Sequence, residues 1–299
     1  MLRDGDESGK EPGGNLWENA AGIGGRGVAG GRRIGGAGWC ADAAGDRSLA
    51  VDHDAMKIMT RCWGTTEEHL ACDEAVLDAC ESGESGTEAG VLRFYEVETP
   101  CVVVGYGNRV ETEVDLTACD AVGVAVLRRA SGGGTVVLGP GCLAYALVLP
   151  VALAPELSTV TGTNRWVMER NRRAMEAATG RRVTVRGHTD LAIDEWKFSG
   201  NAQRRRQRAV LFHGTILCGM DLGRVSGLLP MPSWQPEYRK GRHHGDFLMN
   251  LGIPVERVRE AFAAEWGVTG PWEGGESLDA GVGRWMAERY GQRAWHRRF

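Results

Sequence analysis

The sequence predicts an α+β (mixed α/β) domain in which central mixed or antiparallel sheets are flanked by helices. Three observations favour this class. Many short runs have the apolar and β-branched composition of strands. One long segment between these runs has the period and the cap of a helix, and two more helical segments come near the C-terminus.

The first 55 residues differ in composition from the rest of the chain. The stretch GGNLWENAAGIGGRGVAGGRRIGGAGW is rich in glycine, alanine and arginine and shows no helical or strand period, so we expect residues 1–55 to be disordered. Translation that starts at Met56 or Met59 would leave this stretch out. A single folded domain is expected over 60–299, with 250–299 as a short helical C-terminal segment.

Local signals mark the ends of the expected helices. Residues 65–68 (TTEE) match a capping box that opens a helix reaching about Ser82. A second helix runs from about Asn164 to Ala178 and ends at Gly180, a residue typical of C-terminal caps. The last two helices are expected at 255–266 and at about 277–290.

The expected strands are short and lie between these helices. They cover residues 91–97, 101–106, 123–129, 135–138, 143–149, 181–187, 190–194 and 209–219.

Composition excludes several classes of protein. The formal net charge of -4 is not that of a general nucleic-acid binder. No apolar run reaches the ~18 residues of a membrane helix, and residues 1–10 lack the apolar core of a signal peptide. None of the eight cysteines has CxxC spacing, which argues against a zinc site or a disulfide framework. We therefore expect a cytoplasmic protein that binds neither nucleic acid nor membrane.

The stretch RRASGGGTVVLGPGC (128–142) contains three consecutive glycines after two arginines. Such a loop lets backbone N–H groups approach an anion closely, and Arg128 and Arg129 add planar donors. A turn with two surface arginines is the alternative interpretation. The stretch is not a P-loop, because no Gly-Lys-Ser/Thr follows.

A second stretch, 187–217, contains a lysine, Lys197, beside a small-residue loop with the sequence SGNAQ. A lysine there can contact a phosphate and an acyl carboxylate together, which favours transfer between them. His213 is either a core residue or a participant. Asp190 and Asp194 are either metal ligands or solvated.

The run RRRQR (204–208) lies between the last two expected strands of this stretch. It is a charged hairpin tip or, alternatively, a docking surface for an acidic protein.

Together these motifs resemble the catalytic domain of the lipoate–protein ligase A family, within the biotin/lipoate ligase superfamily. The similarity runs through most of 65–295 and includes HLACDEAVLDACESG, LRFYEVETPCVVVGYGN, YRKGRHHGDFLMNLGIP and AERYGQRAW. RRASGGG has the form of the lipoate branch, whereas the GRGRRGR-type loop of the biotin branch is missing.

The resemblance implies roles for particular residues. Lys197 would bridge the acyl carbonyl and the phosphate as the catalytic lysine, and His213 would lie close by in the core. It implies that the acyl and adenylate pocket is lined by Arg129, Ser131, Gly132, Gly133 and Gly134, and that the nucleotide is surrounded by Asp190, Ser199, Gly200 and Ala202. It assigns no metal ligands.

The chemistry implied is activation of lipoate with ATP and Mg²⁺, followed by transfer to one lysine of an acceptor. The acceptors would be lipoyl domains of 2-oxoacid dehydrogenase E2 subunits or the glycine-cleavage H protein. No protein nucleophile is needed, because the substrate carboxylate is the nucleophile of the activation step and the target lysine is that of the transfer step.

Two departures from the family pattern leave the reaction open. Leu138-Gly139 stands where lipoate ligases usually carry His-Asp. We also expect the chain to lack the accessory C-terminal domain of longer ligases, in which case a separate accessory subunit would be needed or only a preactivated acyl group would be transferred.

Two alternative functions follow. Octanoyltransferases and lipoyl amidotransferases of this fold use a cysteine upstream of the lysine, and residues 182–196 contain none. This favours a ligase, although Cys142 remains a candidate nucleophile beside its interpretation as a small buried residue. A non-catalytic protein that binds lipoate or lipoyl domains is the second alternative, and Lys197 in its SGNAQ context argues against it. The sequence does not distinguish lipoate from octanoate.

Overall fold

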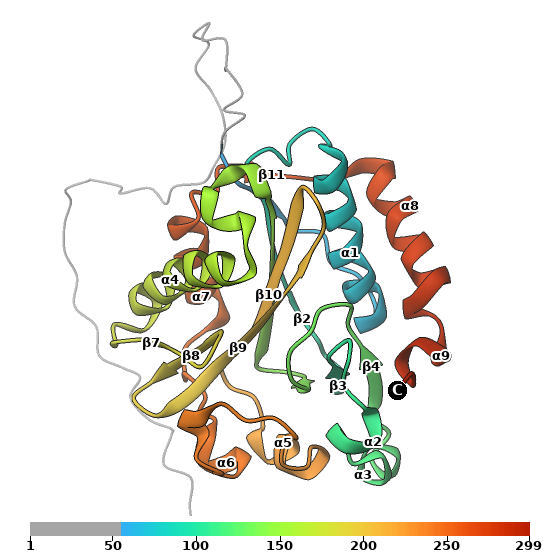
Figure 1. Ribbon diagram of the computed structural model, residues 1–299, viewed down its shortest axis with the longest axis vertical. Helices are drawn as coiled ribbons and strands as arrows, with labels where there is room; N and C mark the ends of the chain where they lie inside the picture. Colours follow the sequence, from blue (N-terminus) through green and yellow to red (C-terminus); the bar gives the residue numbers. More distant parts are fainter. Residues whose placement is uncertain (1–54) are drawn as a thin grey trace, which may run out of the picture. The chain divides into compact units, whose positions relative to one another are not determined.

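Two sheets form the centre of the computed structural model, which describes residues 55–299 (Figure 1). The larger, mixed sheet has the order β11-β1-β2-β6-β10-β9-β8-β7, and the smaller has the order β4-β3-β5. The strands are β1 (Lys57–Met59), β2 (Val91–Glu96), β3 (Cys101–Val104), β4 (Ala125–Arg128), β5 (Val136–Leu138), β6 (Cys142–Pro150), β7 (Thr184–Arg186), β8 (Asp190–Ile193), β9 (Trp196–Arg205), β10 (Ala209–Leu217) and β11 (Gly270–Pro271). This architecture confirms the predicted α+β class.

Helices cover both faces of the larger sheet. The long ones are α1 (Thr66–Ser82), α4 (Val160–Thr179), α7 (Val255–Glu265) and α8 (Gly275–Trp285). Figure 1 shows α4 and α7 on one side of β10, and α1 and α8 on the other. The shorter ones are α2 (Val110–Glu113), α3 (Leu116–Ala121), α5 (Leu222–Leu228), α6 (His244–Phe247) and α9 (Arg293–His296), with a π-helical turn at Met286–Tyr290.

The apolar sequence of β6 reflects these two covered faces. Alternate residues of a strand point to opposite faces. Ala144 and Val148 therefore join the core around α1, while Leu143 and Leu147 join the core around α4. The strand runs antiparallel to both β2 and β10, so it lies in the middle of the sheet.

The predicted helix caps are confirmed. The Thr65 hydroxyl accepts from the Glu68 amide, and the Glu68 carboxylate accepts from the Thr65 amide, which completes the capping box. Gly180 has a φ of 67° and ends α4 in the left-handed conformation. The helix begins at Val160, earlier than predicted, because Thr159 caps it.

The loop predicted around SGNAQ is wrong. These residues belong to β9, which pairs with β8 from Trp196 to Gly200 and with β10 from Ser199 to Arg205. Pairing with the neighbouring strands outweighs the weak strand preference of glycine and asparagine. The predicted disorder of residues 1–55 falls almost wholly outside the described residues. No helix within 55–299 is both long and apolar enough to cross a membrane.

Candidate active site

A cavity of about 300 Å³ lies between the glycine loop, β9, β10 and the segment 229–248. Its apolar lining includes Leu70, Val103, Leu138, Ala144 and Leu217. The lining also brings together most of the predicted site residues, namely Arg129, Gly133, Gly134, Asp190, Lys197, Ser199, Gly200, Ala202 and His213. Segments far apart in the sequence thus contribute to one site of the size expected for a small molecule.

The glycine loop is folded tightly around the Arg129 side chain. This guanidinium donates to the carbonyls of Gly132 (2.6 Å) and Gly134 (2.7 Å) and to the Ser131 hydroxyl (3.0 Å). A further bond to the Val103 carbonyl leaves one of its five N–H groups free. Burial lowers the pKa of Arg129 to about 10, so the side chain keeps its charge at neutral pH.

Arg128 does not contribute to the cavity. It is fully buried and donates to the carbonyls of Gly105, Tyr106 and Asn108. The prediction that both arginines offer donors to an anion is therefore wrong for Arg128. It ends β4, and successive residues of an extended chain point in opposite directions.

Lys197 forms an ion pair inside the cavity. Its Nζ lies 2.8 Å from Oδ1 of Asp190, whose Oδ2 accepts from the Tyr238 hydroxyl at 2.8 Å. Gly200 makes room for the lysine, because a Cβ atom there would lie 2.9 Å from Nζ. The Asp190 carboxylate therefore holds the lysine over Gly200, which has no side chain to obstruct it.

A buried chain of polar contacts reaches the cavity from α1. The Ser131 hydroxyl lies 2.5 Å from Nε2 of His213, and Nδ1 of His213 lies 2.9 Å from Asp73. Burial favours the neutral acid, but Arg93 and His213 outweigh it, so the pKa of Asp73 is below its ordinary value. The carboxylate then accepts from Nδ1–H, which leaves Nε2 to accept from Ser131.

This order of groups matches a Ser-His-Asp triad, but the serine is not placed as a nucleophile. Ser131 is 1% exposed and does not line the cavity, whereas His213 does. Gly132 also lies outside the lining. We interpret these contacts as the means by which His213 and the glycine loop are held in place.

The segment 229–248 adds groups that sequence reasoning missed. Trp234 stacks on His188, with 5.6 Å between ring centroids and 11° between planes. Arg239 is 5% exposed, and within 55–299 its side chain donates only to the Arg242 carbonyl and to a methionine sulfur. Burial and the nearby Arg239 charge lower the pKa of His244 to about 4. This segment therefore offers the cavity an aromatic surface and a buried cation that forms no direct ion pair within 55–299.

Residues 65–263 match the family model described as the lipoyl protein ligase A/B catalytic domain. The chain belongs to this family. The resemblance predicted from the motifs is thus confirmed, as is the prediction of a lipoate-ligase-like enzyme at the level of the family.

Curated relatives of this family member carry two kinds of name. Lipoate-protein ligase A subunit 1 of Thermoplasma acidophilum is 30% identical over 66% of this chain and 77% of its own length. An octanoyltransferase LipM of Carboxydothermus hydrogenoformans is 28% identical over 71% of this chain and 85% of its own. A provisionally named lipoate-protein ligase A of Aeropyrum pernix is 32% identical, and the match spans 61% of that protein.

Solved structures share the fold. A lipoate-protein ligase A bound with ATP superposes with a TM-score of 0.68 at 22% identity, over 82% of this chain and 98% of that one. The bi-partite ligase of T. acidophilum, studied with its E2 lipoyl domain, gives 0.67 at 22% identity, over 82% of this chain and 96% of that one. At this identity the likeness concerns the fold.

A nucleophilic role for Cys142 does not fit this lipoyl ligase fold. The thiol is 2% exposed and does not line the cavity. Burial, with Cys218 nearby, raises its pKa to about 12. No cysteine within 55–299 lines the cavity, so its described walls offer no thiolate.

The two residues in the His-Asp position offer no polar side chain to the cavity. Leu138 is buried in β5 and lines the cavity, and Gly139 packs on Pro100. The cavity's carboxylates come instead from Asp190 and Glu113, and Glu113 binds Ser233. Residues 55–299 contain no group of three or more side chains suited to hold a metal ion.

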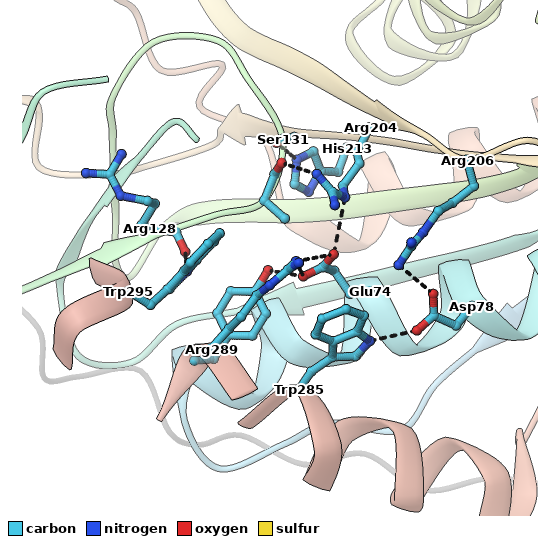
Figure 2. Close-up of polar contacts among 12 residues, drawn as sticks. Glu74, Asp78, Arg128, Ser131, Arg204, Arg206, His213, Trp285, Arg289 and Trp295 are labelled. Carbon is cyan, nitrogen blue, oxygen red and sulfur yellow. Dashed lines mark hydrogen bonds and ion pairs between the residues drawn. The ribbon is translucent and has the colours of Figure 1, made fainter. Parts of the chain in front are cut away.

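Contacts with α1 engage two arginines of RRRQR as ion pairs, Arg204 with Glu74 and Arg206 with Asp78 (Figure 2). Arg208 is exposed and its guanidinium donates to the Glu81 backbone carbonyl. The charged hairpin tip is therefore partly paired, and a docking role for it stays a prediction. Asp194, by contrast, has a side chain that is 85% exposed, which agrees with a solvated residue.

Proposed function

We propose that this family member activates lipoate or a related medium-chain acid with ATP and attaches it to a lysine of a lipoyl-domain protein. The Lys197–Asp190 ion pair carries the proposal, because it places an ammonium in a cavity whose described walls hold no cysteine. A transferase would need a nucleophile there, whereas a ligase needs charge neutralisation and positioning.

In the first step a carboxylate oxygen of the acid attacks the α-phosphate of ATP, and pyrophosphate leaves. Lys197 would lie against the carboxylate and the phosphate and offset their negative charge. Within 55–299 the amides of Gly133 and Gly134 donate to no protein acceptor, so they are free to bind an anion. The stacked Trp234 and His188 rings offer a surface for the base.

In the second step the amine of the target lysine attacks the acyl carbonyl, and AMP leaves. The acceptors would be lipoyl domains of 2-oxoacid dehydrogenase E2 subunits or the glycine-cleavage H protein. The relative in T. acidophilum is a bi-partite ligase studied with its E2 lipoyl domain, which supports this class of partner and an accessory subunit acting in trans. The proposed location is the cytoplasm.

The cavity can supply Mg²⁺ with one carboxylate ligand, and phosphate oxygens of the substrate would supply the others. Mg²⁺ is commonly bound by one or two carboxylates together with substrate phosphates. Asp190 would supply the carboxylate, and the ion would neutralise charge on the phosphates. Asp190 also holds Lys197, so it serves the proposed reaction without the ion as well.

Lipoate-dependent exchange of pyrophosphate into ATP tests this proposal. We expect exchange by the wild type and a loss of at least about 100-fold in Lys197→Met. The absence of exchange in the wild type, with and without a candidate accessory subunit, would refute adenylation.

Octanoyl transfer is the second candidate, because a relative named octanoyltransferase LipM is aligned over 85% of its length. Transfer from octanoyl-carrier protein to a lipoyl domain without ATP would support it. Complementation of a host unable to attach lipoate separates the two, since a ligase needs added lipoate for growth. Lipoate binding with neither exchange nor transfer would support a non-catalytic binder.

A further inference from the structure

The C-terminal segment, residues 275–299, contacts Arg128, just before the glycine loop, although it lies beyond the residues matched by the family model. It consists of α8, the π-helical turn and α9. Figure 2 shows its side chains facing α1, the β9–β10 hairpin and β4. Two separate routes of polar contacts lead from it to the residues on either side of Arg129.

The first route is direct and gives hydrogen-bond partners to backbone groups at the edge of the small sheet. β4 is an edge strand, and such a strand leaves backbone groups without partners. The Trp295 indole donates to the Arg128 carbonyl at 2.9 Å, and the Arg128 amide donates to Nδ1 of His296 at 3.0 Å. Nδ1 is therefore the acceptor, so Nε2–H donates to the Tyr290 carbonyl. Both backbone groups of Arg128 are thus held by this segment.

The second route passes through α1. Arg289 binds both carboxylate oxygens of Glu74, at 2.8 and 2.6 Å. Glu74 is 1% exposed and also forms an ion pair with Arg204, with 3.2 Å between Oε1 and the guanidinium Nε. Arg204 in turn donates to the Ala130 carbonyl at 3.0 Å. The carbonyl groups of residues 128 and 130 are therefore both fixed, and Arg129 lies between them.

We propose that Trp295, His296 and Arg289 are positioning residues of the reaction. They act by fixing the backbone on both sides of Arg129, whose guanidinium shapes the glycine loop. The proposal rests on the proposed function for its effect on catalysis. It predicts a larger KM for the acid when the contacts are lost, because the loop then samples conformations that do not bind the substrate.

Two matched tryptophans test the proposal. Trp295→Phe keeps an aromatic ring but removes the N–H that binds Arg128. Trp285→Phe removes an N–H that donates to Asp78 at 2.8 Å, on the same segment, and keeps an aromatic ring against Arg289, so the second route is left in place. Both side chains are buried, at 8% and 5% exposed, so the structural cost should be similar.

We expect hydrogen–deuterium exchange of peptides covering 128–135 to speed up about five-fold in Trp295→Phe and to stay unchanged in Trp285→Phe. The KM for lipoate in pyrophosphate exchange should rise by a similar factor in the first variant only. Equal effects in both variants, or no change in Trp295→Phe, would overturn the proposal.

A second pair covers the case in which Trp295→Phe does not fold. His296→Asn keeps an acceptor for the Arg128 amide, whereas His296→Leu removes it. We expect faster exchange of the loop in His296→Leu and near wild-type exchange in His296→Asn; the same behaviour in both would count against the proposal. Because hydrogen–deuterium exchange needs no activity, a wild type without pyrophosphate exchange would refute the proposed function alone.

Discussion

Asp73→Asn should destabilise this protein strongly, because it leaves a buried cation without its counter-charge. Asp73 is 2% exposed and its partner Arg93 is 1% exposed. Removing one partner of a buried ion pair costs about 3–5 kcal/mol. Arg93 would still donate to the carbonyl and Nδ1 of His69, at 3.0 and 2.8 Å. We therefore expect a loss near the lower end, about 3 kcal/mol of unfolding free energy.

The measurement is urea unfolding near neutral pH for Asp73→Asn, for Arg93→Met and for the double variant. If the cost comes from an unpaired charge, the double variant loses less stability than the sum of the two single variants. We expect that difference to be at least about 1 kcal/mol. Costs that add to within about 0.5 kcal/mol would refute the reasoning.

Three further predictions concern the site and its surroundings. Gly105→Ala should lower the unfolding free energy by about 1–3 kcal/mol and slow pyrophosphate exchange, because its Cβ would lie 2.2 Å from a glycine-loop carbonyl; Gly107→Ala, with open space around it, is the control. Asp190→Asn should reduce pyrophosphate exchange about 100-fold, whereas Asp194→Asn on the same hairpin should leave it unchanged. Burial lowers the pKa of His69 to about 4, so between pH 6.5 and 4 the unfolded chain binds a proton that the folded chain does not. Urea titrations should therefore show the unfolding free energy falling by up to about 3 kcal/mol as the pH is lowered through this window. In His69→Gln this dependence on pH should be weaker.

Features with local causes were predictable from the sequence. The capping box at Thr65 and the glycine cap at Gly180 depend on a few neighbouring residues, and both are confirmed. The nature of β9 was not predictable in this way, since its glycine and asparagine are poor strand formers and only the neighbouring strands stabilise them. β1 and β11 are short and depend on tertiary pairing.

Part of the cavity lining was predicted where a motif carries its own chemistry. Lys197 and Gly133 were named because a lysine beside small residues and a run of glycines both favour anion binding, and both line the cavity. Asp73 was missed, because an acid on a helix is usually solvated and only the fold places this one beside His213. Arg128 could have been excluded from sequence, since a strand that points Arg129 into the cavity points its neighbour away.

Two consecutive acids on α1 explain why so many charges are buried beside the cavity. Asp73 binds His213, which contacts Ser131, while Glu74 binds Arg204, which contacts the Ala130 carbonyl. One turn of one helix therefore fixes two consecutive residues of the glycine loop. Apolar residues of similar volume are often as stable as buried ion pairs, but they cannot hold a particular carbonyl or hydroxyl in place. The buried charges are therefore better explained by the position of the loop than by the stability of the core.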